Sequence, residues 1–436
     1  MSSLQLGLSA FGMLLVMLAL GIPVGYALLA AAMVSLLMIG GPSLAMQIAT
    51  TLPFDSLAQY SLVIVPMFVL MGALASASNI TTDLFDAMNK WVGGSRGSLL
   101  SATVLGSGGF AAVSGSTMVN SVVFTKLALP EMIRLNYDRG FAAACIAAAG
   151  TFAALIPPSL AMVFFALLTG ESIGALLISG VVPGVLTIIV YLIGIQVLVR
   201  INPKIAPQVT ARYSMKEKLS TLPNVLPISA LVALVIGGIY MGAIFPSAAG
   251  AVGAVGAFVI ALVMRRMSLA STRESLLSTA TTTAILFAVI MGGLMFSRAL
   301  VFSGFIAEAS NFILGLGVTP TTFLIGIGII YLVLGAFIDP TSILIITVPV
   351  MYPIAQSMDI NPLWLAVIIV KLIELSCITP PVGLNLFAVT SAGKGSFSIK
   401  ELWVGIIPFI ILEVIILGVL IAFPEISTWL PEAAGL

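Results

Sequence analysis

Two stretches in the second half of the chain decide its fold: Ala336-Phe-Ile-Asp339-Pro340-Thr341-Ser342 and Cys377-Ile-Thr379-Pro380-Pro381-Val-Gly383-Leu-Asn385. Both lie deep inside apolar segments, where a membrane helix is normally continuous and free of polar and helix-breaking residues. Proline frees backbone carbonyl and amide groups, and in lipid these groups need a partner. Such breaks are tolerated where they are buried in protein or line a site. An ionisable residue such as Asp339 at such a point therefore indicates function.

The composition is that of a polytopic membrane protein. Hydrophobic residues make up 60% of the 436 residues, charged residues make up 8%, and the mean hydropathy is +1.22. No basic patch points to nucleic acid, and the absence of histidine excludes His-based metal or acid–base chemistry. Cys145 and Cys377 both lie in apolar segments, so we expect neither a structural disulfide nor a cysteine metal site. Because the N-terminus lacks a basic region, its first apolar run is expected to be a retained helix.

The distribution of apolar runs predicts roughly ten spans of about 20 residues and two helical hairpins. The hairpins are 97–133, interrupted at Ser114-Gly115-Ser116, and 319–357, interrupted at Asp339-Pro340. Their arms are too short to cross a membrane easily, so both hairpins are interpreted as re-entrant. Amphipathic arms, 79–91 and 302–316, precede them. The broken spans are 141–169 and 362–389, and the others are 4–20, 24–39, 61–77, 173–199, 225–240, 248–264, 275–297 and 402–423.

The two halves of the chain repeat one plan. Landmarks recur at a nearly constant offset, which indicates an internal repeat. Pairs that lie 223 positions apart are Pro130 and Pro353, Pro157 and Pro380, Pro158 and Pro381, and Phe164 and Phe387. We therefore predict a first repeat over 1–200, a polar cytoplasmic linker over 201–224, and a second repeat over 225–436.

Charge predicts the orientation of the spans. Under this span count the lysine and arginine residues gather on one side, interpreted as the cytoplasm, and only Arg298 and Lys371 are exceptions. The opposite side carries acidic residues, including Glu171 and Glu308. The first hairpin then opens to the cytoplasm and the second to the outside. This relation is an inverted-topology repeat, which is common among secondary transporters.

Four helix breaks are expected to meet near the membrane midplane. A half-helix that ends at a break offers free carbonyls, which suit a hard cation such as sodium. A half-helix that begins there offers free amides and a positive dipole end, which suit an anion. Asp339 is expected to cap a helix that begins at Pro340, and Thr379 one that begins at Pro380. Ser159 and Asn385 follow their breaks within one turn and could reach a ligand.

Structural interpretations of the same residues stay open. Double prolines can be kinks alone, and Asp339 can be a helix cap alone. Ser114-Gly115-Ser116 can serve close helix packing, because small residues line membrane helix interfaces. Lys371 and Glu374 are three residues apart and can pair across one turn of helix, and we interpret this pair as structural.

Three motifs carry a family resemblance. The run from Phe110-Ala-Ala-Val-Ser114-Gly115-Ser116 through Leu129-Pro130-Glu131-Met132 resembles the large membrane subunit of tripartite ATP-independent periplasmic (TRAP) transporters. So do Ile156-Pro-Pro-Ser159 with Pro183-Gly184, and Thr379-Pro-Pro-Val-Gly-Leu-Asn-Leu-Phe387. The resemblance covers nearly the whole chain. It departs at Phe245-Pro-Ser-Ala-Ala249, where the family usually has a Thr-Pro-Thr-Glu-Ala-type run, so the acid is missing here.

The resemblance implies a sodium-coupled importer of an organic acid that works by an elevator-type movement of the hairpin domain in a bacterial inner membrane. It also implies a small membrane subunit and a periplasmic substrate-binding protein as partners, two or more sodium ions, and no organic cofactor. The first sodium site would use Ser114, Gly115, Ser116 and the backbone at Pro157, and the second Asp339 with Thr379, Pro381 and Gly383. The carboxylate would lie between the sodium sites, at Ser116, Ser159, Thr341 and Asn385.

Other function classes remain as alternatives. A self-sufficient sodium/dicarboxylate symporter would share the inverted hairpins and transport without a binding protein. An ion channel would need a selectivity filter or a ring of charges, and the sequence offers neither. An enzyme is not expected, because no nucleophile–base pair or metal set is visible.

Overall fold

The computed structural model describes residues 2–207 and 213–436, and every regular element in that part of the chain is a helix. Residues 208–212 of the predicted linker 201–224 therefore lie outside the described residues. Seven helical segments in the described part are long and apolar enough to cross a membrane. Three further predicted spans, the first helix and the two double-proline helices, form shorter apolar helices. The seven segments are Val24–Leu57, Tyr60–Ala77, Ile173–Ile201, Met215–Tyr240, Pro246–Val263, Leu269–Phe302 and Ile399–Ala422.

The first half of the chain runs from an N-terminal helix pair to a long helix that ends before the linker. Short 3₁₀ turns cover Tyr60–Val63 and Thr151–Ala154. The helices are α1 (Ser3–Ala19), α2 (Val24–Leu57), α3 (Ile64–Ala77), α4 (Ile80–Val92), α5 (Ser98–Ser114), α6 (Thr117–Arg134), α7 (Arg139–Gly150), α8 (Leu160–Thr169), α9 (Ile173–Ser179) and α10 (Val181–Ile201).

The second half follows the same order of a span, an arm, a helix pair, a broken helix and a last long helix. Its helices are α11 (Met215–Leu219), α12 (Leu222–Val232) with a π-helical turn at Ala233–Gly237, α13 (Gly238–Tyr240), α14 (Pro246–Val263), α15 (Leu269–Phe302), α16 (Phe305–Gly315), α17 (Pro320–Gly335), α18 (Pro340–Ser357), α19 (Pro362–Cys377), α20 (Leu384–Gly393), α21 (Ile399–Ala422) and α22 (Glu425–Ala433).

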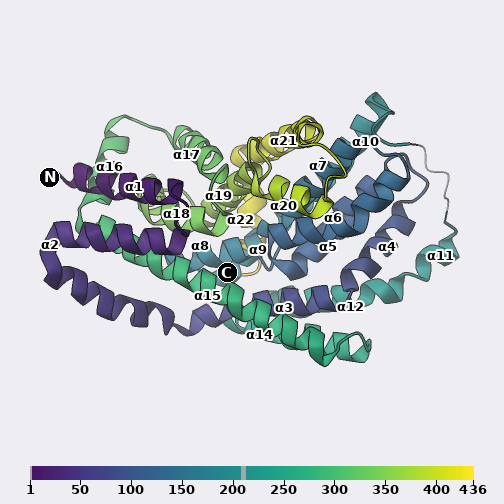
Figure 1. Ribbon diagram of the computed structural model, residues 1–436, viewed down its shortest axis with the longest axis horizontal. Coiled ribbons are helices and arrows are strands. Elements are labelled where there is room, and N and C mark those ends of the chain that lie inside the picture. Colours follow the sequence, from purple (N-terminus) through teal and green to yellow (C-terminus); the bar gives the residue numbers. More distant parts are fainter. Residues whose placement is uncertain (1, 208–212) are drawn as a thin grey trace.

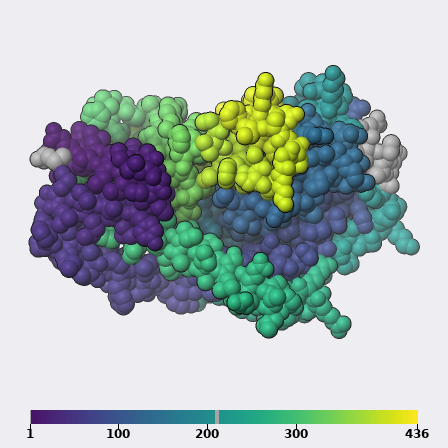
Figure 2. Space-filling view, viewed as in Figure 1, coloured from purple at the N-terminus to yellow at the C-terminus, as the bar shows by residue number. Residues whose placement is uncertain are grey.

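Helix α15 connects the regions of the molecule. It crosses the fold obliquely in Figure 1 and contacts α2, α3 and α18. The first arms of both broken helices, α7 and α19, lie against the last long helix, α21. The space-filling view shows the N-terminal residues at the end of the molecule opposite to the residues near 200 (Figure 2).

The predicted interruptions are confirmed as breaks between helices. The chain leaves helical geometry between α5 and α6, between α8 and the turn that follows α7, between α17 and α18, and between α19 and α20. Proline stands at the first position of α17, α18 and α19, and each is preceded by a side-chain cap. Proline suits this position because its missing N–H has no intrahelical acceptor there. The caps are Thr319, Asp339 and Asn361.

The predicted cap at Thr379 is wrong. Helix α20 begins at Leu384, and the Thr379 hydroxyl donates a hydrogen bond to the Leu375 carbonyl at 2.7 Å. The reason is local, because a residue that precedes proline is excluded from the α region. Pro380 precedes Pro381 and so cannot open a helix.

Two spans are longer than predicted. The expected span 24–39 continues as α2 to Leu57, across a kink at Gly41 (φ 68°, ψ −168°) followed by Pro42. The expected span 275–297 is the middle of the 34-residue α15. The terminal helix α22 has no counterpart among the predicted elements. Helix α22 and the first turns of α15 contain polar residues. A prediction based on hydropathy therefore does not include them in an apolar span.

Two glycines set the crossing of α7 and α21. A Cβ placed on Gly405 would lie 2.6 Å from the Gly140 carbonyl oxygen, and a Cβ on Gly140 would lie 2.4 Å from the Glu401 carbonyl oxygen. Both contacts are with backbone atoms, which cannot move aside as a flexible side chain can. The backbones of α7 and α21 therefore lie in close contact, which is possible in membrane helix pairs when the residues at the crossing are small.

Gly405→Ala is expected to destabilise the protein, and Gly418→Ala on the same helix is not. A Cβ at Gly418 meets no atom within 4 Å. Both changes bring the same gain in helix propensity, so the difference between them isolates the crossing. Overpacking of this kind costs about 1–3 kcal/mol. Thermal unfolding of the two purified variants measures it, and equal melting temperatures would contradict the tight crossing.

Candidate functional site

The first hairpin breaks through a left-handed residue and a serine cap. Gly115 ends α5 with φ 58° and ψ 5°, a conformation that glycine adopts without a Cβ penalty. Ser116 then caps α6, because its hydroxyl accepts the Val119 amide at 3.5 Å. The Ser114 hydroxyl is buried and has no hydrogen-bond partner in the structure. The sequence Ser-Gly-Ser thus supplies both the turn and the cap.

The first hairpin touches the first double-proline break. A Cβ placed on Gly115 would lie 2.9 Å from the carbonyl oxygen of Pro158. The tip of the α5–α6 pair therefore packs backbone to backbone against the loop between α7 and α8. The predicted meeting of these two breaks is a feature of the structure.

The second hairpin breaks at a carboxylate cap. One oxygen of Asp339 accepts the amides of Thr341 and Ser342, both at 3.1 Å. The other oxygen accepts the Ser342 hydroxyl. The predicted capping role of Asp339 is confirmed. Asp339 is half-buried, whereas Ser342 is fully buried.

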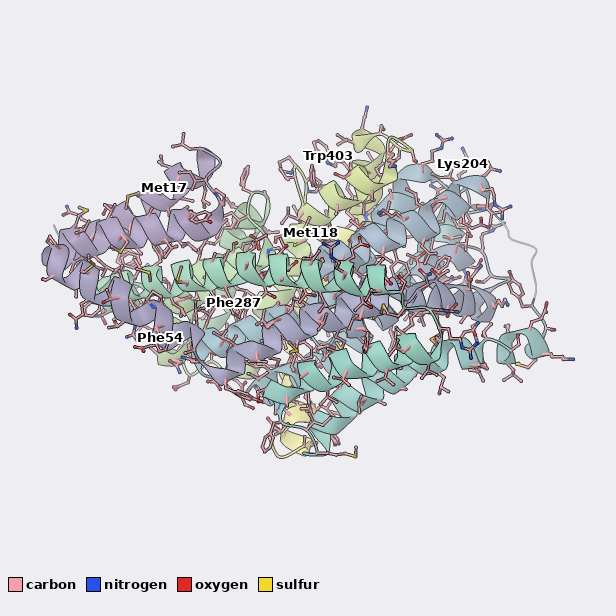
Figure 3. All side chains as sticks on the ribbon, turned by 60° about the horizontal axis from the view of Figure 1, so that its bottom comes forward. Met17, Phe54, Met118, Lys204, Phe287 and Trp403 are labelled. Carbon is pink, nitrogen blue, oxygen red and sulfur yellow. The ribbon has the colours of Figure 1, made fainter. Side chains whose placement is uncertain are left out.

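Both hairpin tips face one cavity of about 490 Å³. This volume is within the usual range of about 300–1,000 Å³ for small-molecule sites. Met118, at the start of α6, lies beside the middle of α15 in Figure 3 and belongs to the lining. The polar lining comes from both hairpins, α3 and α15, and consists of Ser76, Ser114, Ser116, Thr117, Ser271, Glu274, Ser275, Ser278, Thr282, Asp339 and Thr341.

The charge of the cavity has one sign. Glu274 and Asp339 line it, and no lysine or arginine occurs among the described residues of its lining. Helices α6 and α18 both begin at its wall, so their positive dipole ends lie there. The first amides of α18 already bond to Asp339, so the unbonded amides are those at the start of α6. The arrangement can accommodate a cation at the carboxylates and an anion at the start of α6.

Several predicted site residues lie outside the lining of this cavity. The Ser159 hydroxyl caps α8 and donates to the Ala154 carbonyl. Asn385 is fully buried, and its amide donates to the Ala147 carbonyl of α7 at 3.1 Å. Pro157 lies against α9 and the π-helical turn. In the second break Pro381 is exposed, whereas Gly383 is buried with φ 54°.

Sequence reasoning missed the polar face of α15. Five of its residues line the cavity: Ser271, Glu274, Ser275, Ser278 and Thr282. They lie three, four, seven and eleven positions after the first of them, a pattern that places them on one face of a helix. The signal was present as small polar residues within an apolar segment, which mark a buried or ligand-facing surface in a membrane helix.

A second, smaller cavity lies farther along α15. It measures about 270 Å³ and includes Gln59, Ser297 and the exposed Arg298. The α15 residues that line it, from Ile290 to Val301, follow those that line the first cavity, which end at Leu286. Helix α15 therefore borders both cavities: its first half lines the larger cavity and its second half lines the smaller one.

The fold is that of a polytopic helical membrane protein with a cavity between its two hairpin tips. Two solved structures have a similar fold. The YdaH transporter of Alcanivorax borkumensis aligns with a TM-score of 0.57 over 88% of this chain and 90% of that one, and MtrF of Neisseria gonorrhoeae with 0.51 over 88% and 85%. Both are 14% identical in sequence, so the likeness is one of fold alone.

The sequence family is more specific. The model of the family described as "Tripartite ATP-independent periplasmic transporter, DctM component" matches residues 11–426. The chain therefore belongs to this family, whose members are large permease subunits of the inner membrane. These proteins are transporter permeases, which are not enzymes.

Similar proteins cover nearly the whole chain. The C4-dicarboxylate TRAP transporter large permease protein DctM of Pseudomonas aeruginosa is 34% identical over 88% of this chain and 89% of its own. The protein of the same name in Vibrio cholerae is 31% identical over 95% of both chains. The sialic acid TRAP transporter large permease protein SiaM of Vibrio cholerae is 28% identical over 97% of this chain and 98% of its own.

Gly115→Ala is expected to destabilise the protein more than Gly170→Ala. Both glycines have a positive φ, 58° and 79°, so both substitutions carry left-handed strain of about 1–2 kcal/mol. Only Gly115 also meets a backbone atom, because nothing lies within 4 Å of a Cβ on Gly170. The comparison of melting temperatures isolates the contact with Pro158. An equal loss in both variants would show that the hairpin tip can move away from that break.

Proposed function

We propose that the protein imports an organic acid together with sodium ions, with a periplasmic binding protein that delivers the acid and a small membrane subunit that completes the permease. Membership in the tripartite family supports the two partners. The names of the relatives refer to C4-dicarboxylates and sialic acid, which are organic acids. We assign the carboxylate class to this chain on that basis.

The cavity between the two hairpin tips is the observation that carries the proposal. A carboxylate in this cavity meets acidic side chains and no basic one among the described lining residues. Bound cations would neutralise Glu274 and Asp339 and allow an anion to approach. The need to neutralise these two acids before an anion can bind favours cation-coupled import over import of the anion alone.

Two sodium sites follow from the breaks. The first combines Ser114, Gly115 and Ser116 with the backbone at Pro157, and the contact between Gly115 and Pro158 supports it. The second combines Asp339 with the backbone of Thr379, Pro381 and Gly383. A Cβ on Gly335 would lie 2.0 Å from the Ser376 hydroxyl, so the end of α17 packs against the end of α19.

The substrate carboxylate is placed at the helix N-termini. Ser116 and Thr341 line the cavity at the starts of α6 and α18 and are the proposed direct contacts. Ser159 and Asn385 bond to backbone carbonyls of Ala154 and Ala147 and are proposed to hold the breaks in position near the substrate. At the start of α6, backbone amides can bind a carboxylate without a lysine or arginine. At the start of α18, where Asp339 already accepts the first amides, the hydroxyl of Thr341 is the proposed contact.

Transport needs access from both sides of the membrane. We propose that the hairpins 97–133 and 319–357 are re-entrant, belong to inverted repeats, and move along α15 in an elevator-type step. The two cavities along α15 support two positions for the site. In this arrangement the larger cavity opens to the cytoplasm, and Arg298 lies on the periplasmic side.

Sodium is expected to raise the melting temperature of the purified protein, whereas potassium and choline at equal ionic strength are not. A ligand that binds only the folded state stabilises it by about 2.7 kcal/mol at 100 times its Kd. Asp339→Asn should keep the cap and lose most of the sodium response, because Asn and Asp cap equally well. Asp339→Ala should lose both, at a further cost of about 1 kcal/mol for the cap.

Reconstituted uptake tests the coupling and the partners. Vesicles with the permease, its small subunit and a loaded binding protein should accumulate the acid only under an inward sodium gradient. Uptake by this chain alone would instead identify a self-sufficient symporter. The absence of a sodium response in the complete assembly would overturn sodium coupling.

A further inference from the structure

A sealed charge cluster lies away from the cavity, where α19 meets α10 and α21. The side chains of Lys371, Glu374 and Glu413 are 0%, 0% and 1% exposed. None of the three lines either cavity described above. The sequence showed the pair on α19, but Glu413 comes from a helix that begins 28 residues after Lys371.

The contacts of the cluster are short and cross three helices. The Lys371 ammonium lies 2.5 Å from Glu374 Oε2 and 2.5 Å from Glu413 Oε2. It also donates to the Thr187 hydroxyl at 3.4 Å. The Tyr191 hydroxyl donates to Glu413 Oε1 at 2.6 Å. The cluster therefore joins the broken helix α19 to both α10 and α21.

The charges of the cluster do not balance if every group is ionised. Two carboxylates face one ammonium, and Lys371 is the sole cation within ion-pair distance of either among the described residues. The other titratable neighbours are Tyr191 of α10, Cys145 of α7 and Cys377 of α19, which can contribute only further negative charge. An uncompensated charge in a buried site is strongly destabilising.

The two glutamates differ in how well their oxygens are satisfied. Glu413 receives the Tyr191 hydroxyl on one oxygen and faces Lys371 with the other. Glu374 Oε1 and Glu413 Oε2 are both buried without a hydrogen-bond partner in the structure. Glu413 Oε2, however, lies 2.5 Å from the Lys371 ammonium, whereas the ion pair of Glu374 with Lys371 is made through its other oxygen, Oε2. The carboxylate charge is therefore better supported on Glu413 than on Glu374.

We propose that this cluster is a proton-binding site that holds one proton on Glu374. The site is then neutral, with Lys371 paired to the ionised Glu413 and bonded to the neutral acid. This neutral clamp fixes the first arm of the broken helix α19 against α10 and α21.

Infrared spectroscopy of the purified full-length protein tests the proposal through the carbonyl stretch of protonated carboxylic acids. The wild type should show one such buried acid at neutral pH. Glu374→Gln and Glu413→Gln should both lose it, because each leaves one acid for one lysine. Lys371→Met should show two. The exposed Glu425→Gln is the control and should leave the wild-type band unchanged.

Tyr191→Phe locates the proton. If Glu374 carries it, removal of the hydroxyl bonded to Glu413 leaves the frequency of the band unchanged. A shifted band would place the proton on Glu413 and overturn the assignment to Glu374. The absence of a protonated acid in the wild type, or its persistence in Glu374→Gln, would overturn the site. The two Gln variants keep the test valid if Lys371→Met does not fold.

Discussion

The need to satisfy backbone polar groups where helices break in an apolar environment governs this structure. Lipid offers no hydrogen bonds, so each interrupted helix must find partners within the protein. Ser116 and Asp339 supply them from inside the breaks, as caps of α6 and α18. Gly115 allows the remaining close approach, against the Pro158 carbonyl. The caps and contacts that satisfy the backbone groups at the breaks lie at the hairpin tips, and both tips line one cavity.

Features with local causes could be predicted from the sequence. Proline and its preceding cap residue identify the start of α18, and the Ser-Gly-Ser run identifies the first hairpin tip. The Thr379 cap failed although its cause is also local, because the exclusion of Pro380 from helical geometry outweighs the preference of proline for a first position. Helix lengths were underestimated where polar residues extend an apolar run, as in α15.

Features that depend on helix partners could not be predicted. The polar face of α15 becomes part of the cavity because α15 packs against α3 and α18, and the tips of both hairpins line the same cavity. Glu413 joins Lys371 because α21 packs against α19. The polar residues of α15 mark one helix face, but nothing in the chain shows which helices that face meets, and nothing pairs Glu413 with Lys371. The family resemblance supplied the class of protein, while the lining of the cavity and the third member of the charge cluster required the structure.

The two groups of acids differ in access, and this difference separates their roles. Asp339 and Glu274 face an open cavity, so an ion can arrive from solution and leave again. Glu374 and Glu413 are sealed among three helices and share one lysine. A sealed charge must be balanced permanently, whereas an accessible charge can be balanced by an exchangeable ion. Coupled transport needs charges that an exchangeable ion can neutralise, as at Asp339. A charge that is neutralised permanently, as in the Lys371 cluster, instead suits a contact that holds α19 in place.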